Sequence, residues 1–213
     1  MNKAWILFVA LMTFFVSCDK EITVERLDGT IWEGDASSSL FSGRGGTYTA
    51  GIAFHGDSTA FFLSYLDGQL VGGRVVNYEL NYPDILFQVK YDRHDYDVEY
   101  GSFVDSKTLS LQRDSTTLSK KNRKLKSIGA KGLVGTHWEF REPEGEGATL
   151  FFQSSTSGKF CSLNHYGEVS EEEDFNYSFD GVIGYITVYG DLIGFGIIDG
   201  KLVSDEVVFK KIS

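Results

Sequence analysis

The sequence predicts an all-β protein made of two small antiparallel meander barrels in tandem, each with about eight short strands. Three observations lead to this prediction. The motif LDGTIWEG at Leu27–Gly34 returns as LVGTHWEF at Leu133–Phe140. Apolar residues alternate with a period near two, and Ser, Gly, Asp and Asn clusters interrupt them roughly every ten residues. Aromatic residues make up 15% of the 213 residues, a bias that favours pleated strands.

Residues 1–17 have the composition of an export signal. Lys3 precedes an uncharged apolar run, Ala4–Val16, which is shorter than the roughly 20 residues of a membrane-spanning helix. The run ends at Ser17 and Cys18, and this ending resembles the signal of bacterial lipoproteins. In that class the cysteine is acylated and becomes the first mature residue, so the resemblance implies lipidation at Cys18. The alternative is an ordinary signal peptide in which Cys18 has no role.

A lipid anchor would hold the chain stably at a membrane, because its two or three acyl chains bury many methylenes at about 0.8 kcal/mol each. We expect residues 18–26 to form a short charged tether behind this anchor. We also expect the protein at the bacterial outer membrane or cell surface, or facing the periplasm. The chain has only two cysteines, so lipidation of Cys18 leaves Cys161 unpaired. The apolar neighbours of Cys161 predict a buried, unreactive thiol.

The two copies of the motif open two repeats, residues 27–120 and residues 133–213. Asn77-Tyr78 in the first copy matches Asn176-Tyr177 in the second, and in each copy a turn and an apolar strand follow. Each copy then closes with a hairpin that ends in two lysines. A repeat of this length indicates duplication of a folding unit.

Apolar or alternating runs in the second repeat supply its expected strands, and the first repeat counts similarly. About eight such strands in roughly 80 to 95 residues suit a closed meander, which removes exposed sheet edges. The runs are Gly135–Arg141, Thr149–Gln153, Lys159–Leu163, Phe175–Phe179, Val182–Tyr189, Leu192–Ile198, Lys201–Ser204 and Glu206–Lys211.

The Leu-x-Gly-Thr-x-Trp motif resembles the Gly-x-Trp start of lipocalins and other calycins, and the Gly-Thr-Trp start of avidin-like barrels. A closer resemblance is to the lipocalin-like tandem-repeat lipoproteins of Bacteroidetes, which begin with this motif and end in an apolar strand carrying Lys. The resemblance implies a barrel fold in which Trp32 and Trp138 each plug one end. It also implies a location in the cell envelope, but no reaction.

Residues 121–132 are expected to link the two repeats. Six of the twenty basic residues fall between Ser119 and Gly132. A short run of charge is usually solvated, which favours a plain linker. The alternative is a basic collar that contacts anionic lipid or glycan. The acidic stretch Glu168–Phe175 is interpreted as a solvated loop that leads into a strand.

Two positions have residue types that occur in catalytic sites. Ser58 lies in a Gly-Asp-Ser sequence after His55, but the second copy has Gln153 at the place of His55. A serine nucleophile requires a base within hydrogen-bond reach and a third, orienting group. We therefore interpret Ser58 as a hairpin residue. His137 matches Ile31 in the first copy, and a position that accepts either residue is a poor catalytic candidate.

The stretch Tyr91–Tyr100 combines carboxylates with an imidazole, a donor set that can hold a divalent cation. Its spacing differs from that of a calcium loop, which requires Gly at the sixth position. We therefore expect a charged hairpin, with no metal site and no cofactor, and with the acidic residues from Asp95 onward on one solvated strand face. The side chains concerned are Asp92, His94, Asp95, Asp97 and Glu99.

The formal net charge of −10 argues against a nucleic-acid partner, which would require a basic face. We favour a binding or interaction module of the cell envelope that recognises a glycan, a small apolar ligand or a protein. The alternative is a structural or accessory subunit of a surface assembly. A large exposed apolar patch would favour the alternative, whereas a ligand-sized cavity with aromatic and a few polar walls would favour binding. An enzyme ranks last, because no catalytic motif occurs, and we predict no catalytic residue.

Overall fold

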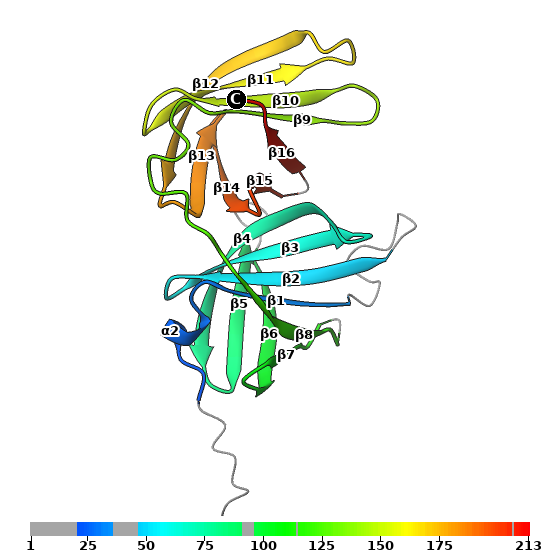
Figure 1. The fold of residues 1–213 in the computed structure, drawn as a ribbon, viewed down its shortest axis with the longest axis vertical. Helices are drawn as coiled ribbons and strands as arrows, with labels where there is room; N and C mark the ends of the chain where they lie inside the picture. Colours follow the sequence, from blue (N-terminus) through cyan, green and yellow to red (C-terminus); the bar gives the residue numbers. More distant parts are fainter. Residues whose placement is uncertain (1–20, 36–46, 91–95, 114, 206) are drawn as a thin grey trace, which may run out of the picture.

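The computed structural model describes residues 21–35, 47–90, 96–113, 115–205 and 207–213. Within them the chain folds into two closed antiparallel barrels of eight strands each, one above the other in Figure 1. The predicted all-β fold of two tandem meander barrels is confirmed. Residues 1–17 and Cys18 lie outside the described residues. In the described part of the chain, no helix has the length and hydrophobicity to span a membrane.

The first barrel follows a short helix, α2 (Val24–Leu27), which packs against its core. Each strand pairs with the next one along the chain, and β8 returns to β1 to close the sheet. The strands are β1 (Thr30–Asp35), β2 (Tyr48–His55), β3 (Thr59–Leu66), β4 (Gln69–Asn81), β5 (Asp84–Lys90), β6 (Tyr96–Asp105), β7 (Thr108–Leu111) and β8 (Thr117–Lys124).

The second barrel repeats this topology, and β16 returns to β9. The interpretation of Glu168–Phe175 as a loop is wrong, because residues from Val169 onward hydrogen-bond to β11 as part of β12. The strands are β9 (His137–Arg141), β10 (Gly147–Phe152), β11 (Ser157–Leu163), β12 (Val169–Phe179), β13 (Ile183–Val188), β14 (Asp191–Ile198), β15 (Lys201–Ser204) and β16 (Val207–Lys211).

The segment between the barrels is fastened to both of them. β8 continues to Lys124, so it includes the first residues of the expected linker. The Leu125 N–H donates to the Gly29 carbonyl oxygen at 3.0 Å, on the first barrel. The Ile128 N–H donates to the Gly181 carbonyl oxygen at 2.8 Å, on the second. These main-chain bonds restrict the path of the connection.

The repeated motif has a defined structural role at the start of the first barrel. Leu27 is fully buried, and Gly29 has a φ of 71°, a conformation that favours glycine. The Thr30 hydroxyl donates to the Leu27 carbonyl oxygen at 2.5 Å and accepts a hydrogen bond from Trp32 Nε1 at 2.9 Å. The threonine therefore satisfies the indole N–H of a tryptophan that is buried in the core.

The second barrel repeats the same arrangement. Leu133 is buried, and Gly135 has a φ of 76°. The Thr136 hydroxyl donates to the Leu133 carbonyl oxygen at 2.6 Å and accepts from Trp138 Nε1 at 2.7 Å. The leucine, glycine, threonine and tryptophan of the motif therefore have the same structural roles in both barrels. These shared roles account for the occurrence of the motif at the start of each barrel.

The repeated Asn-Tyr pairs have a second shared role. The Tyr78 hydroxyl donates to the Gly56 carbonyl oxygen at 2.9 Å, and the Tyr177 hydroxyl donates to the Ser154 carbonyl oxygen at 2.6 Å. Each acceptor lies in the turn between the second and third strands of its barrel. The buried tyrosine rings therefore tie this turn to the core.

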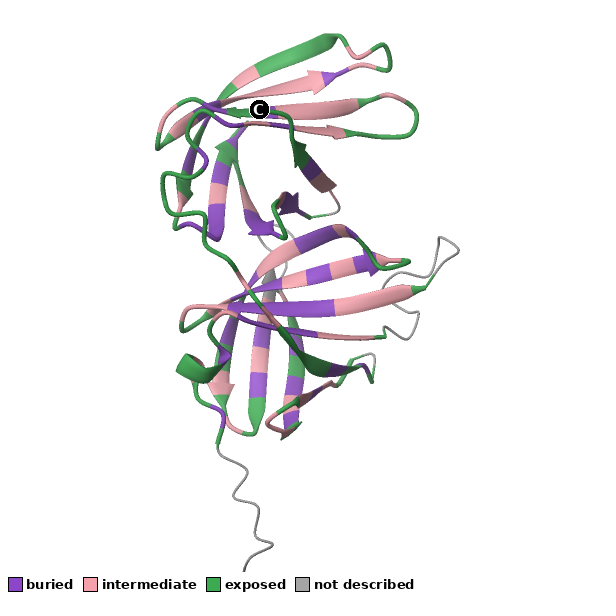
Figure 2. Ribbon diagram, viewed as in Figure 1, coloured by how far each residue is buried: buried purple, intermediate pink, exposed green. Residues whose placement is uncertain are grey.

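An apolar cluster joins the barrels where β1–β4 face the strands from β13 to β16 (Figure 2). Phe61 is fully buried there and lies against Gly196, where an added Cβ would be 3.1 Å from the phenyl ring. The glycine therefore provides room for the ring. The buried members of this interface are Ile31, Ala53, Phe61, Leu63, Tyr65, Leu70, Val182, Ile183, Ile198 and Val203.

Polar contacts surround this interface. The Gly73 N–H donates to the Asp205 carbonyl oxygen at 2.6 Å, and Arg74 Nε lies 2.9 Å from the carboxylate of the same residue. On another side, His55 Nε2 lies 2.8 Å from the Asp180 carboxylate. The barrels are therefore joined by specific hydrogen bonds as well as by apolar burial.

Candidate functional site in the second barrel

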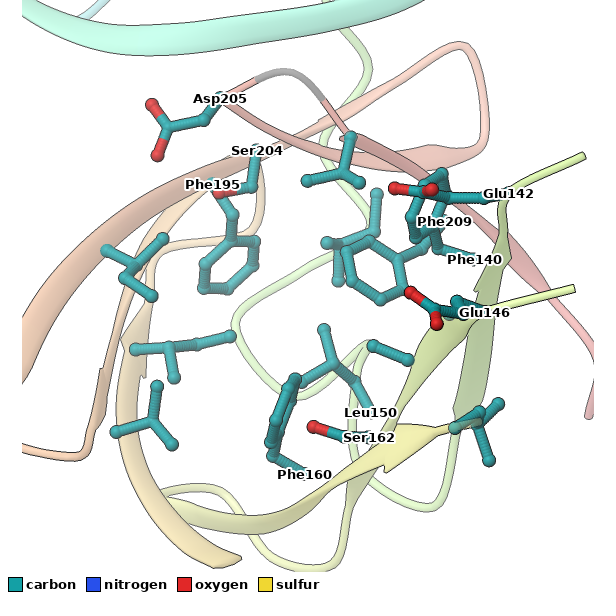
Figure 3. A pocket seen from close by; sticks show the side chains of 18 of the residues that line it. Phe140, Glu142, Glu146, Leu150, Phe160, Ser162, Phe195, Ser204, Asp205 and Phe209 are labelled. Carbon is teal, nitrogen blue, oxygen red and sulfur yellow. The ribbon is translucent and has the colours of Figure 1, made fainter. Parts of the chain in front are cut away.

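The interior of the second barrel contains a cavity of about 610 Å³, shown in Figure 3. This volume lies within the range of about 300 to 1,000 Å³ typical of small-molecule sites. The cavity is lined by inward-facing side chains of most strands of the barrel. Its apolar and aromatic walls include Phe140, Ala148, Leu150, Phe160, Leu163, Ile186, Val188, Ile193, Phe195, Leu202, Val207 and Phe209.

Aromatic packing closes the end of the barrel near the repeated motif. The Phe152 ring lies edge-on to Tyr177, with centroids 4.8 Å apart, and edge-on to Phe175 at 5.4 Å. Phe152 and Trp138 are both buried in this core. The cavity therefore extends from these side chains towards the other end of the barrel, where β9 and β10 are joined.

A few polar groups interrupt the apolar walls. Ser162, Asn164 and Ser204 line the cavity. The Ser204 hydroxyl donates to the Gly194 carbonyl oxygen at 2.8 Å, while Asn164 Oδ1 accepts the N–H of Glu168 at 2.9 Å. These bonds fix the orientation of both side chains, so the site combines an apolar interior with a small number of oriented polar groups.

Two carboxylates stand at the mouth. Glu142 and Glu146 lie on either side of the β9–β10 turn and line the cavity, beside Phe140 and Phe209 in Figure 3. Asp205 also lines the cavity, but its carboxylate is paired with Arg74 of the first barrel. The mouth is therefore acidic, whereas the interior is apolar.

At one inward position the first barrel carries a larger side chain than the second. Phe87 pairs in register with Tyr78, just as Ile186 pairs with Tyr177, so Phe87 and Ile186 are equivalent. The Phe87 ring is fully buried, with its centroid 5.1 Å from that of Phe62. A smaller isoleucine at this position leaves space in the second barrel.

A second inward position also has a smaller side chain in the second barrel than in the first. Leu109 faces Phe103 and Leu202 faces Ile197, so the next inward positions, Leu111 and Ser204, are also equivalent. Leu111 packs against the core of the first barrel, whereas Ser204 lines the cavity of the second. The interiors of the two barrels have therefore diverged while their cores at the motif end are alike.

In the described part of the chain, no hydrogen bond joins the Ser58 hydroxyl to a base. His55 contacts Asp180 at 2.8 Å and Asp28 at 3.9 Å, and so connects the two barrels. Ser58 lies in the β2–β3 turn, where its carbonyl oxygen accepts the Tyr78 N–H. This location fits the interpretation of Ser58 as a hairpin residue. His137 lies beside the ring of Phe151, at 5.7 Å between centroids.

The acidic stretch around residue 95 is only partly described. Asp92, His94 and Asp95 lie outside the described residues, and the described part of the chain contains no group of His, Cys and carboxylate side chains suited to a metal. Asp97 accepts a hydrogen bond from the Arg113 guanidinium. Glu99, expected on a solvated face, is instead buried, and its carboxylate accepts the Arg113 N–H at 3.1 Å. The buried carboxylate is stabilised by this hydrogen bond.

Cys161 is partly exposed, so the expectation of a buried thiol is wrong. It lies on the outer face of β11, because the inward positions of that strand belong to Phe160 and its alternate neighbours. Its Sγ is 3.8 Å from the Glu172 carboxylate, which also pairs with Lys159 at 2.5 Å. The thiol has an acidic environment rather than the electropositive one that activates cysteine.

One residue of the basic run has a structural role that the sequence did not indicate. Arg123 on β8 pairs with Glu33 of its own barrel and with Asp199 of the second barrel. Its Nη2 also donates to the Tyr65 hydroxyl at 2.8 Å. Burial, reinforced by the charge of Glu33, raises the pKa of Tyr65. The other five basic residues of the run are exposed, as expected for a solvated linker, and one of them, Lys120, has its Nζ 5.8 Å from the centroid of the Trp32 ring.

Comparison with known proteins found no match: no protein-family model, no curated protein and no solved structure corresponds to this chain.

Proposed function

We propose that this protein is a lipid-anchored binding protein of the bacterial cell envelope, and that its second barrel holds a small, largely apolar molecule. The observation that supports the binding role is the cavity of about 610 Å³ with aromatic walls and few polar groups. This combination is the one expected of a binding module rather than of a structural spacer. The ending Ser17-Cys18 and its resemblance to lipoprotein signals support the anchor.

Binding is tested with a neutral, environment-sensitive dye, N-phenyl-1-naphthylamine. The protein used begins at Asp19 and so keeps every described residue. We expect saturable fluorescence enhancement. The double variant Ile186→Phe/Ser204→Leu gives the second barrel the first barrel's larger side chains, and we expect it to weaken dye binding at least about tenfold.

Tyr185→Phe provides the matched control, because Tyr185 lies on the same strand as Ile186 but outside the cavity lining. The binding role is refuted if the dye does not bind, or if the filled variant, shown by circular dichroism to be folded, binds it as well as the wild type.

The anchor is tested separately in the full chain. We expect radiolabelled palmitate to be incorporated in bacterial cells and the protein to sediment with membranes. Cys18→Ser should remove the label, because the Cys18 Sγ is the atom that would carry the diacylglyceryl group through a thioether bond. Equal labelling of the variant and the wild type would contradict the assignment of Cys18.

A further inference from the structure

The charge at the cavity mouth distinguishes between classes of ligand. Among the described residues that line the cavity, no side chain is basic, whereas Glu142 and Glu146 both contribute to its rim. The Glu142 N–H donates to the Glu146 carbonyl oxygen at 2.7 Å, and this bond holds both residues at the same edge of the barrel. A molecule in the cavity would therefore meet apolar walls inside and two carboxylates at its exposed end.

These carboxylates are not neutralised by the nearest cation of their hairpin. Arg141 donates instead to the Glu139 carboxylate at 3.1 Å and to the Gly145 carbonyl oxygen at 3.2 Å. Neither glutamate pairs with a basic side chain in the part of the chain that the structure describes. The negative charge of the mouth is thus available to a ligand.

The net charge of the whole second repeat also favours a cationic ligand. Residues 133–213 contain 14 acidic and 5 basic side chains, so they carry −9 of the net charge of −10. Residues 1–132 contain 16 acidic and 15 basic side chains and are nearly neutral. A concave apolar site surrounded by charge of one sign concentrates ions of the opposite sign. An anionic amphiphile would be repelled at this mouth.

We propose that the second barrel binds a cationic amphiphile, with its apolar part in the cavity and its ammonium group at Glu142 and Glu146. This inference rests on the proposed binding function and adds the charge of the ligand. The apolar interior provides most of the affinity, because burial of each methylene contributes about 0.8 kcal/mol. The two carboxylates provide the selection between cation, neutral molecule and anion.

The test uses decylammonium, decanol and decanoate, which share one alkyl tail and differ in the charge of the head group. Each is titrated calorimetrically at neutral pH into the protein that begins at Asp19. We expect decylammonium to bind most tightly and decanoate most weakly. Glu142→Gln/Glu146→Gln should weaken decylammonium binding about five- to tenfold and leave decanol binding unchanged. The expected loss is modest because exposed ion pairs contribute little free energy.

Glu144→Gln is the matched control, because Glu144 lies in the same turn but does not line the cavity. We expect it to leave all three affinities unchanged. Equal affinity for the three compounds, a preference for decanoate, or an unaltered decylammonium affinity in the double variant would overturn the cationic assignment. Failure of all three compounds to bind would instead refute the proposed binding function.

Discussion

The two barrels have the same strand register but opposite chemistry at equivalent outer positions. The register makes Phe61 equivalent to Lys159 and Ile31 equivalent to His137. Phe61 and Ile31 are buried against the second barrel, whereas Lys159 forms an ion pair with Glu172 on an outer surface. The outer face of β1–β4 is therefore apolar at these positions, whereas the equivalent positions on β9–β12 are polar.

On β14 and its equivalent strand β6 the difference is reversed, because here the second barrel is buried at the interface and the first is exposed. Gly194 and Ile198 of β14 pack against the first barrel, and Gly194 lies next to Val75. Their equivalents in the first barrel, Tyr100 and Val104, are 55% and 68% exposed. The barrels are thus joined through unlike faces, and each uses a face that the other leaves exposed.

Inward and outward positions of a duplicated barrel are therefore under different physical constraints. A contact between unlike faces can in principle be repeated to form an open chain of modules. The charged residues on the free β9–β12 face interrupt that pattern, in the way that polar outer faces end a repeat array. The inward positions of the motif remain alike because both barrels need the same closed end.

The largest expected effect comes from replacing the central apolar residue of the interface. Phe61→Ala should lower the free energy of unfolding by about 3 to 5 kcal/mol, the range for deletion of a buried phenyl group. Lys159→Ala, at the equivalent position, should change it by less than about 0.5 kcal/mol. Denaturant unfolding measures both variants. Similar losses in the two variants would contradict the asymmetry of the outer faces.

A smaller effect is expected from enlarging a residue on the other side of the interface. A Cβ on Gly194 would lie 2.7 Å from the Val75 side chain, so Gly194→Ala should destabilise the junction by about 1 to 3 kcal/mol. Tyr100→Ala, at the equivalent exposed position, should be nearly neutral. Small-angle scattering, together with unfolding curves, would detect separated barrels in the glycine variant. An unaltered junction there would show that close contact is not required.

Tyr78 and Tyr177, which make equivalent hydrogen bonds, test whether the two barrels hold their turns in the same way. Burial raises the pKa of Tyr78 to about 12 and also raises that of Tyr177. A folded pKa above the ordinary value of about 10 means that stability from the neutral phenol is present below about pH 10 and declines as pH rises towards about 12. We expect Tyr78→Phe to reduce this alkaline decline and to cost about 1 kcal/mol at neutral pH through the lost hydrogen bond.

Tyr177→Phe should behave similarly, because its hydroxyl makes the equivalent bond. Unfolding measured at neutral and alkaline pH would compare the variants. An effect confined to one barrel would show that the two turns are not held alike.

The smallest expected effect concerns the hydrogen bond between Asp180 of the second barrel and His55 of the first. Burial opposes ionisation of Asp180, but hydrogen bonds from the N–H groups of Ile183 and Val182 and from His55 outweigh it and lower its pKa. A lowered folded pKa gives stability that is present above the ordinary value near 3.9 and is lost as pH falls through the folded value. Asp180→Asn should remove this acid-range dependence and cost less than about 1 kcal/mol at neutral pH.

Asp174→Asn, which alters an exposed carboxylate on β12, serves as the control. Unfolding curves between neutral and strongly acidic pH provide the measurement. Identical acid dependence in Asp180→Asn and the wild type would rule out this role for the Asp180 carboxylate.

Much of the fold could be predicted from the sequence because it depends on local pattern. Period-two alternation and regular turns predicted the strands, and the repeat of Leu-x-Gly-Thr-x-Trp predicted two units. Cys161 was expected to be buried but is partly exposed, and two further errors arose where a residue type suggested exposure but pairing decided otherwise. Glu168–Phe175 is acidic yet extends β12, and Glu99 is charged yet buried beside Arg113. Local composition does not reveal such partners.

The binding site could be predicted only in outline. A ligand-sized cavity with aromatic walls could be named in advance as the criterion for a binding module, but whether one exists depends on side-chain volumes that meet across the barrel. Once the register is known, the differences between Phe87 and Ile186 and between Leu111 and Ser204 become informative. Without the register, these residues are only apolar or small polar positions in separate strands.

The sequence alone determined the all-β class, the duplication and the buried motif at the start of each barrel, because these follow from residues close together along the chain. The tertiary structure decided which faces join the barrels, where Arg123 finds its partners, and that space remains inside the second barrel. These features depend on contacts between residues far apart in sequence. The effect of their size and charge on the cavity and the interface can be assessed only when the closed sheets place them opposite one another.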